Sequence, residues 1–176
     1  LYVSKTYGLD AGFDSMNFRQ DRPAENVANH AMDLVDRFAA SGFECMCGNM
    51  RMAARAVTAI YNRHLRPAGL QATQMTVLWA VIAKREATVK DIAETIVMDQ
   101  TTLLRNLRIL HRRSLVSMTV GDDRRQRLVA ATGEGRDQFA TALPHWQRAQ
   151  KEIDTALGPG GLEVMNKKLR KLVRSV

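Results

Sequence analysis

The chain has 176 residues, of which 45% are hydrophobic and 25% charged, a composition typical of a soluble globular protein with a core of its own. Its apolar runs are too short to span a membrane and its N-terminus lacks a signal-peptide pattern, so the sequence predicts a cytoplasmic protein without a membrane partner. The net charge is +8 and the two cysteines, Cys45 and Cys47, are too few for a disulfide framework.

Three helices are expected after a lead-in without periodicity over residues 1–20. The first begins near Pro23, and the second runs from about residue 44 to residue 66, where Pro67 ends it. Apolar residues recur at helical spacing in each helix. These stripes are Val27, Ala31, Leu34 and Phe38, then Met46, Met50, Ala53, Val57, Ile60 and Tyr61, and finally Met75, Leu78, Trp79 and Ile82.

Two short helices with a brief joint follow. Thr88 and Asp91 form a capping pair for one helix, and Asp99 caps the next. The second of these helices has an inward face of Leu103, Leu107 and Leu110. Because only Val97-Met98 separates the two helices, the segment is predicted to be a helix–turn–helix.

Beyond Ser114 the apolar period changes to two, which indicates β-strands. Val116, Met118 and Val120 alternate with polar residues, and Leu128 and Ala130 continue the alternation on the return strand. Residues 99–132 contain seven arginines and three aspartates, a net charge of +4, and no lysine. A charged hairpin directly after a helix–turn–helix has the layout of a wing. A solvated basic face is the alternative explanation for the charge.

Two more helices complete the chain. A long helix is expected from about residue 133 to residue 157, with a kink at Pro144. After a glycine-rich break, the last helix has a thin apolar side and many basic residues, which favours packing against a partner helix over a membrane surface. Its apolar residues are Leu162, Met165, Leu169 and Leu172.

From residue 44 onward the sequence resembles the MarR family of bacterial regulators. The resemblance rests on AARAVTAIYNRHLRPAGL (53–70), DQTTLLRNLRILHRRSLV (99–116), and DDRRQRLVAAT followed by Gly-Glu-Gly (122–135). It implies a mainly α fold with a small β-hairpin wing, that is, a winged helix–turn–helix with a helical dimerisation region. Residues 71–132 would form the DNA-binding domain, residues 44–70 and 133–176 the dimerisation region, and residues 1–43 an N-terminal extension.

The resemblance implies a homodimer that binds double-stranded DNA at a pseudo-palindromic operator, because the operator mirrors the two-fold symmetry of the protein. Repression is the commoner mode of action in the family, so a repressor is expected. The candidate DNA-binding residues are Thr101, Thr102, Arg105, Asn106 and Arg108 on the helix, and Asp123, Arg124, Arg125 and Arg127 in the wing. Arg105 suits guanine and Asn106 adenine, whereas Arg108 could equally be a solvated side chain. The resemblance implies that Asp123 holds Arg125 for entry into a narrow minor groove.

The resemblance also implies a small-molecule effector, an organic anion of the kind that includes aromatic acids, in a cleft beside the winged domain. The candidate ligand-binding residues are Met50, Arg51, Tyr61, His64, Trp79 and Trp146. Apolar walls with one or two cations would suit such an anion. Met50, Tyr61 and Trp79 could instead be ordinary core residues.

A thiol switch is the alternative mode of sensing. Cys47 lies at the start of a predicted helix, where thiols are more reactive, and its spacing to Arg55 and Tyr61 is similar to that in the family's hydroperoxide sensors. Arg51 and Ala72, however, stand where those sensors have tyrosines. Cys45 is the other redox candidate. The two thiols are two positions apart on one predicted helix, so they should point to different sides of it and should not form a disulfide with each other.

Other functional classes have weaker support. The sequence has no glycine-rich phosphate loop, H-E-x-x-H motif or paired C-x-x-C ligands, so no enzyme activity, metal site or cofactor is expected. A non-specific DNA-coating protein remains a less favoured alternative to sequence-specific binding.

Overall fold

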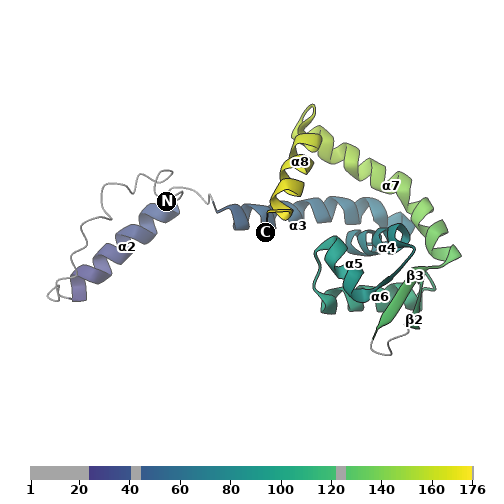
Figure 1. Ribbon diagram of the computed structural model, residues 1–176. Helices are drawn as coiled ribbons and strands as arrows, with labels where there is room; N and C mark the ends of the chain where they lie inside the picture. Colours follow the sequence, from purple (N-terminus) through teal and green to yellow (C-terminus); the bar gives the residue numbers. More distant parts are fainter. Residues whose placement is uncertain (1–23, 41–44, 122–125, 176) are drawn as a thin grey trace. The chain divides into compact units, whose positions relative to one another are not determined.

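The computed structural model describes residues 24–40, 45–121 and 126–175. The chain divides into two units, residues 1–50 and 51–176, which are described separately (Figure 1). In the described ranges, no helix combines the length and apolar character needed to cross a membrane. The first unit contains α2 (Ala24–Ala40), on which Met32, Leu34 and Val35 are exposed. The boundary between the units falls within α3 (Met46–Leu65).

The second unit contains a winged helix–turn–helix followed by two further helices, which confirms the predicted fold class. Its first half consists of the part of α3 from Arg51 onward, then η2 (Arg66–Ala68), α4 (Ala72–Lys84), β1 (Glu86–Thr88), α5 (Val89–Ile96) and α6 (Gln100–Arg112). Its second half consists of β2 (Val116–Val120), β3 (Arg127–Ala131), α7 (Gly133–Leu157) and α8 (Gly161–Val173). In Figure 1, α7 leads away from the sheet and α8 turns back at its far end. Pro144 lies inside α7, which continues on both sides of it.

The sheet has three antiparallel strands in the order β1-β3-β2, one more than the predicted hairpin. Val116 pairs with Ala131 and Met118 with Val129, so these side chains share one face of the sheet. Val129 is fully buried and Ala131 nearly so. The residues that face the core on the return strand, Val129 and Ala131, are therefore offset by one from the alternation of Leu128 and Ala130 seen in the sequence. The charged turn between the strands gives no sequence signal for the residue at which pairing begins. A shift of the register by one residue exchanges the two faces of a strand.

The core of the winged domain is built around the apolar side of α6. Leu103, Leu107 and Leu110 have no exposed surface, as their helical spacing predicts. They pack in one hydrophobic cluster with α4, α5 and the sheet. Burying a leucine side chain stabilises a fold by about 1.5–3 kcal/mol. The three leucines therefore fix which side of α6 faces the core and which side faces outward.

Both predicted caps are present and set the starts of α5 and α6. The Thr88 hydroxyl accepts from the Asp91 N–H at 3.1 Å, and the Asp91 carboxylate accepts from the Thr88 N–H at 3.1 Å. The Asp99 carboxylate accepts from the Thr102 N–H at 2.8 Å. The Thr88 hydroxyl also donates to the Asp91 carboxylate at 2.7 Å. This bond and the one from the Thr88 N–H lower the pKa of Asp91, and the bond from the Thr102 N–H lowers the pKa of Asp99, because each favours the ionised carboxylate.

Candidate nucleic-acid interface and ligand pocket

The outer side of α6 carries the polar residues that the sequence assigned to DNA. Because the leucines face the core, Thr101, Thr102, Arg105 and Arg108 are exposed together, and Asn106 is half-buried. The Asn106 side-chain amide donates to the Thr102 carbonyl at 2.8 Å. The free N–H groups of the first turn of α6 point along the helix axis at its N-terminus, where they suit contact with a phosphate.

The far end of α6 is anchored to its surroundings. Arg113 donates from Nη1 to the Gly69 carbonyl oxygen at 2.7 Å, so this arginine ties α6 to the loop before α4. A ring nitrogen of His111 lies 3.0 Å from the Val116 carbonyl oxygen. The arginines within α6 itself, Arg105, Arg108 and Arg112, are all exposed.

The wing is formed by β2 and β3. Arg127 begins β3, is exposed, and pairs with Val120 across the hairpin. The other candidate wing residues, Asp123, Arg124 and Arg125, lie outside the described residues. The described strands fix the base of the hairpin through five register pairs.

A cavity of about 560 Å³ lies between α3, α4 and α7, a size typical of small-molecule sites. Its lining residues are Tyr61, Leu65, Ala72, Met75, Thr76, Trp79, Phe139, Leu143 and Trp146. Three of the six predicted ligand residues, Tyr61, Trp79 and Trp146, line this cavity, and Met50, Arg51 and His64 do not. The described lining therefore carries no charged side chain.

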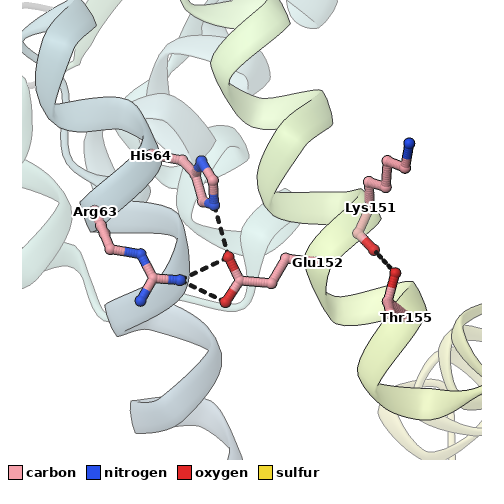
Figure 2. A network of polar contacts seen from close by, with 5 residues as sticks. All are labelled: Arg63, His64, Lys151, Glu152 and Thr155. Atoms are coloured by element: carbon pink, nitrogen blue, oxygen red, sulfur yellow. Dashed lines mark hydrogen bonds and ion pairs between the residues drawn. The ribbon is translucent and has the colours of Figure 1, made fainter.

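His64 participates instead in a polar cluster that joins α3 to α7 (Figure 2). Arg63 donates two hydrogen bonds to the Glu152 carboxylate, and His64 Nε2 lies 2.8 Å from a Glu152 oxygen. These contacts lower the pKa of Glu152. The Tyr61 hydroxyl donates to Gln150 at 2.5 Å, and burial raises the pKa of this tyrosine.

Sequence reasoning found only part of the contribution of α7 to the cavity, because it named Trp146 but missed Phe139 and Leu143. Phe139, Leu143, Trp146 and Gln150 follow one another at spacings of four, three and four residues, which places them on one face of a helix. Phe139, Leu143 and Trp146 line the cavity, and Gln150 holds the Tyr61 hydroxyl. The periodic signal was present in the sequence, but only the fold shows which helices this face meets.

The two cysteines are free thiols and both are exposed. Cys47 lies in the first turn of α3, whereas Cys45 precedes its first helical residue. The expectation that both thiols belong to one helix was therefore wrong for Cys45. Among the described residues, no group of three or more His, Cys, Asp or Glu side chains is placed to hold a metal ion.

Comparisons with known proteins place this geometry in a family. Residues 70–135 match the family model "Winged helix DNA-binding domain". No curated protein matches the chain significantly. The structure of the transcriptional regulator MosR from M. tuberculosis in complex with DNA is 36% identical, with a TM-score of 0.67, and the match covers 75% of this chain and 96% of MosR.

Two further structures are similar at lower identity and show the shared fold. A MarR-family regulator from Rhodococcus sp. is 22% identical over 76% of this chain and 98% of its own, with a TM-score of 0.65. BpsR from Bordetella bronchiseptica, whose DNA binding is regulated by 6-hydroxynicotinic acid, is 24% identical over 74% of this chain and 95% of its own, with a TM-score of 0.67. The match to MosR spans nearly all of that regulator. The chain therefore belongs to the MarR family of winged helix–turn–helix, DNA-binding transcriptional regulators.

Proposed function

We propose that this regulator is a homodimeric repressor that binds a pseudo-palindromic operator and leaves it when an aromatic small molecule binds. The observation that carries the proposal is α6, whose leucine side is fully buried while its threonines and arginines are exposed. MosR was crystallised with DNA, which supports the same partner here. In a two-fold dimer the two α6 helices would lie about one DNA turn apart, and a pseudo-palindromic operator follows.

On α6, Arg105 is proposed to contact guanine through two hydrogen bonds in the major groove, the contact for which its planar guanidinium is suited. Asn106 would exchange its hydrogen bond with the Thr102 carbonyl for a contact with adenine. Thr101, Thr102 and Arg108 would contact phosphates. In the wing, Asp123 is proposed to orient Arg125 into a narrow, A/T-rich minor groove, while Arg124 and Arg127 contact phosphates.

The experiment compares affinity for selected and random DNA. The probe is the tightest-binding duplex selected from a random double-stranded library, measured against a scrambled duplex at fixed salt. Arg105→Ala is expected to lower affinity for the selected duplex by about 10- to 100-fold, because a bidentate base contact is lost. Arg125→Ala should also weaken binding while the protein stays folded.

The matched control is Arg148→Ala, which removes an exposed arginine of α7 and should leave affinity unchanged. Equal affinity of the wild type for selected and scrambled DNA would instead support a DNA-coating protein. Unchanged affinity of Arg105→Ala for the selected duplex would contradict the proposal that α6 reads the operator bases.

The dimerisation region is proposed to comprise residues 44–70 and 133–176. In the single chain, α3 and α8 present apolar side chains to solvent instead of burying them. The exposed apolar residues are Met46, Met52 and Val57 on α3 and Val164, Met165, Leu172 and Val173 on α8. A second copy of the chain would remove this surface from water, which is the usual driving force of a permanent interface.

The effector is proposed to bind in the cavity between α3, α4 and α7. Four aromatic side chains and no charged side chain line its described walls, so an uncharged aromatic compound fits it better than the organic anion expected from sequence. The regulation of BpsR by 6-hydroxynicotinic acid supports a ring-shaped effector in this fold. Ligand binding would hold α7 against the winged domain in an arrangement that no longer matches the operator.

A matched pair of probes, 2-naphthol and 2-naphthoate, tests this proposal by calorimetry and by release of the selected duplex. We expect the neutral probe to bind more tightly and to weaken DNA binding. Leu143→Trp should abolish this response by filling the cavity. Leu157→Trp, at a similarly exposed leucine of the same helix outside the lining, should not. Tighter binding of the carboxylate, or an unaltered response in Leu143→Trp, would exclude the proposed effector class or site.

A thiol switch is the second candidate, favoured by the exposure of both cysteines at the start of α3. Its test is mass spectrometry after a hydroperoxide pulse, with Cys45→Ser and Cys47→Ser as single variants. An oxidised thiol together with lost DNA binding would support it. Unmodified thiols and unaltered DNA binding would exclude it.

A further inference from the structure

The turn between α5 and α6 has an unusual residue at its centre. Val97 ends α5 with φ 51° and ψ 52°, in the left-handed region. Its N–H donates to the Glu94 carbonyl at 3.4 Å, and the Met98 N–H donates to the Ala93 carbonyl at 2.9 Å. This pair of hydrogen bonds is the Schellman motif, whose left-handed position is usually glycine. Here it is a β-branched residue, for which this conformation is strongly disfavoured.

The packing of Val97 does not offset this strain. Its neighbours Ile96 and Met98 pack against the hydrophobic core. Val97 points away from the core and is 73% exposed, more than any other exposed large hydrophobic side chain in the described ranges. Backbone strain and hydrophobic exposure therefore coincide at one residue. Strained residues concentrate where a side chain serves function more than stability.

The position of Val97 indicates what it meets. It lies two residues before Asp99, the cap of α6, and four before Thr101, the first exposed threonine on the outer side of that helix. A duplex placed against the N-terminus of α6 would therefore reach this turn. Val97 has no charge or hydrogen-bonding group on its side chain, so phosphate is excluded as its partner. The apolar surface of DNA consists of thymine methyl groups and deoxyribose carbons.

We propose that Val97 is a DNA-contacting residue that packs against this apolar surface of the operator, beside the bases read by α6. The inference rests on the proposed reading of DNA by α6. Arg105 would recognise a base through hydrogen bonds, whereas Val97 would add a contact that depends on the shape of the DNA and on its thymine methyl groups.

The test separates folding stability from DNA binding. Val97→Gly should raise the melting temperature by about 2–4 °C, because glycine adopts the left-handed conformation without strain. The same change should lower affinity for the selected duplex by about tenfold, as expected for loss of a buried branched side chain. Asparagine tolerates the left-handed conformation and has a polar side chain, so Val97→Asn should lower the affinity for the selected duplex by a similar factor. A loss in both variants excludes greater flexibility of the turn as the cause.

Ser114→Gly is the matched control. Ser114 is exposed and has φ 58° at the opposite end of α6, so the change relieves strain without removing an apolar side chain. We expect higher stability and unaltered DNA binding. Wild-type affinity in Val97→Gly and Val97→Asn, or an equal loss in Ser114→Gly, would overturn the inference. If Arg105→Ala also bound normally, the proposed reading by α6 would fail with it, whereas normal binding by the Val97 variants alone rejects only this contact.

Replacing thymine by uracil in the selected duplex identifies the contacted group. If Val97 contacts a methyl group, one such replacement should weaken the wild type as much as Val97→Gly does, and the two changes together should add nothing further. If the contacted group is deoxyribose, the two losses should add.

Discussion

Gly135 joins the wing to the long helix at a point where no side chain fits. A Cβ atom at this position would overlap the backbone carbonyl oxygen of Leu115. The Gly135 N–H also donates to the Thr132 hydroxyl at 2.9 Å, and that hydroxyl donates to the Ser114 carbonyl at 2.6 Å. The junction of α6, β3 and α7 therefore depends on one glycine for close approach.

Gly135→Ala is expected to destabilise the protein by about 1–3 kcal/mol, the usual cost of overpacking a site that cannot relax. The measurement is urea unfolding followed by circular dichroism. Gly133→Ala, two residues earlier in the same helix, is the control, because a Cβ there has open space around it. Equal stability of the two variants would show that the Leu115 backbone moves aside without cost.

At the scale of elements, α5 and α6 depend on ionised caps. Asp91 and Asp99 have pKa values below the ordinary 3.8 of an aspartate, owing to hydrogen bonds from Thr88 and Thr102. Because the folded-state pKa lies below the unfolded-state value, the unfolded chain binds these protons first. The stabilisation is complete above the unfolded pKa and is lost as the pH falls through the folded pKa.

We therefore expect the free energy of unfolding to decrease as the pH falls below about 4. The double variant Asp91→Asn, Asp99→Asn should show a shallower decrease over this range. Urea unfolding at closely spaced pH values measures both slopes. Identical slopes for the wild type and the variant would assign acid sensitivity to other carboxylates, of which Glu152 is one with a lowered pKa.

At the scale of the whole molecule, the distribution of exposed apolar residues argues for a partner. Val57 on α3 and Leu172 on α8 are 36% and 45% exposed, and both lie in the proposed dimerisation region. Val57→Glu or Leu172→Glu should convert the protein to a monomer in light scattering, because a charge is costly in a desolvated interface. Val120→Glu changes a valine of the wing that is 52% exposed and should remain dimeric.

Monomers with either interface variant would also lose most of their affinity for a two-half-site operator while still binding a single half-site weakly. A wild-type protein that sediments as a monomer at micromolar concentration would contradict the proposed dimer. Dissociation by Val120→Glu as well would show a general effect of added charge.

Local physical chemistry accounts for what the sequence by itself determined. The caps at Thr88 and Asp99, the leucine side of α6 and the existence of the hairpin depend on residues within one or two turns of each other, so periodicity and capping chemistry predict them. The predicted family is confirmed by the identity to MosR. The sequence also placed Thr101, Thr102 and Arg105 on the outer side of α6, because the leucines opposite them allow no other orientation.

Tertiary structure decided the features that join distant segments. Val129 rather than Leu128 faces the core because pairing with β2 sets the register. The cavity is apolar because the apolar side chains of α3, α4 and α7 meet there. The polar cluster forms because Glu152 reaches His64, which lies 88 residues earlier in the sequence. Arg113 holds a loop 44 residues before it. Such contacts depend on where elements pack, which local periodicity does not encode, so the sequence determined which side of each helix is apolar and only the fold determined what that side contacts.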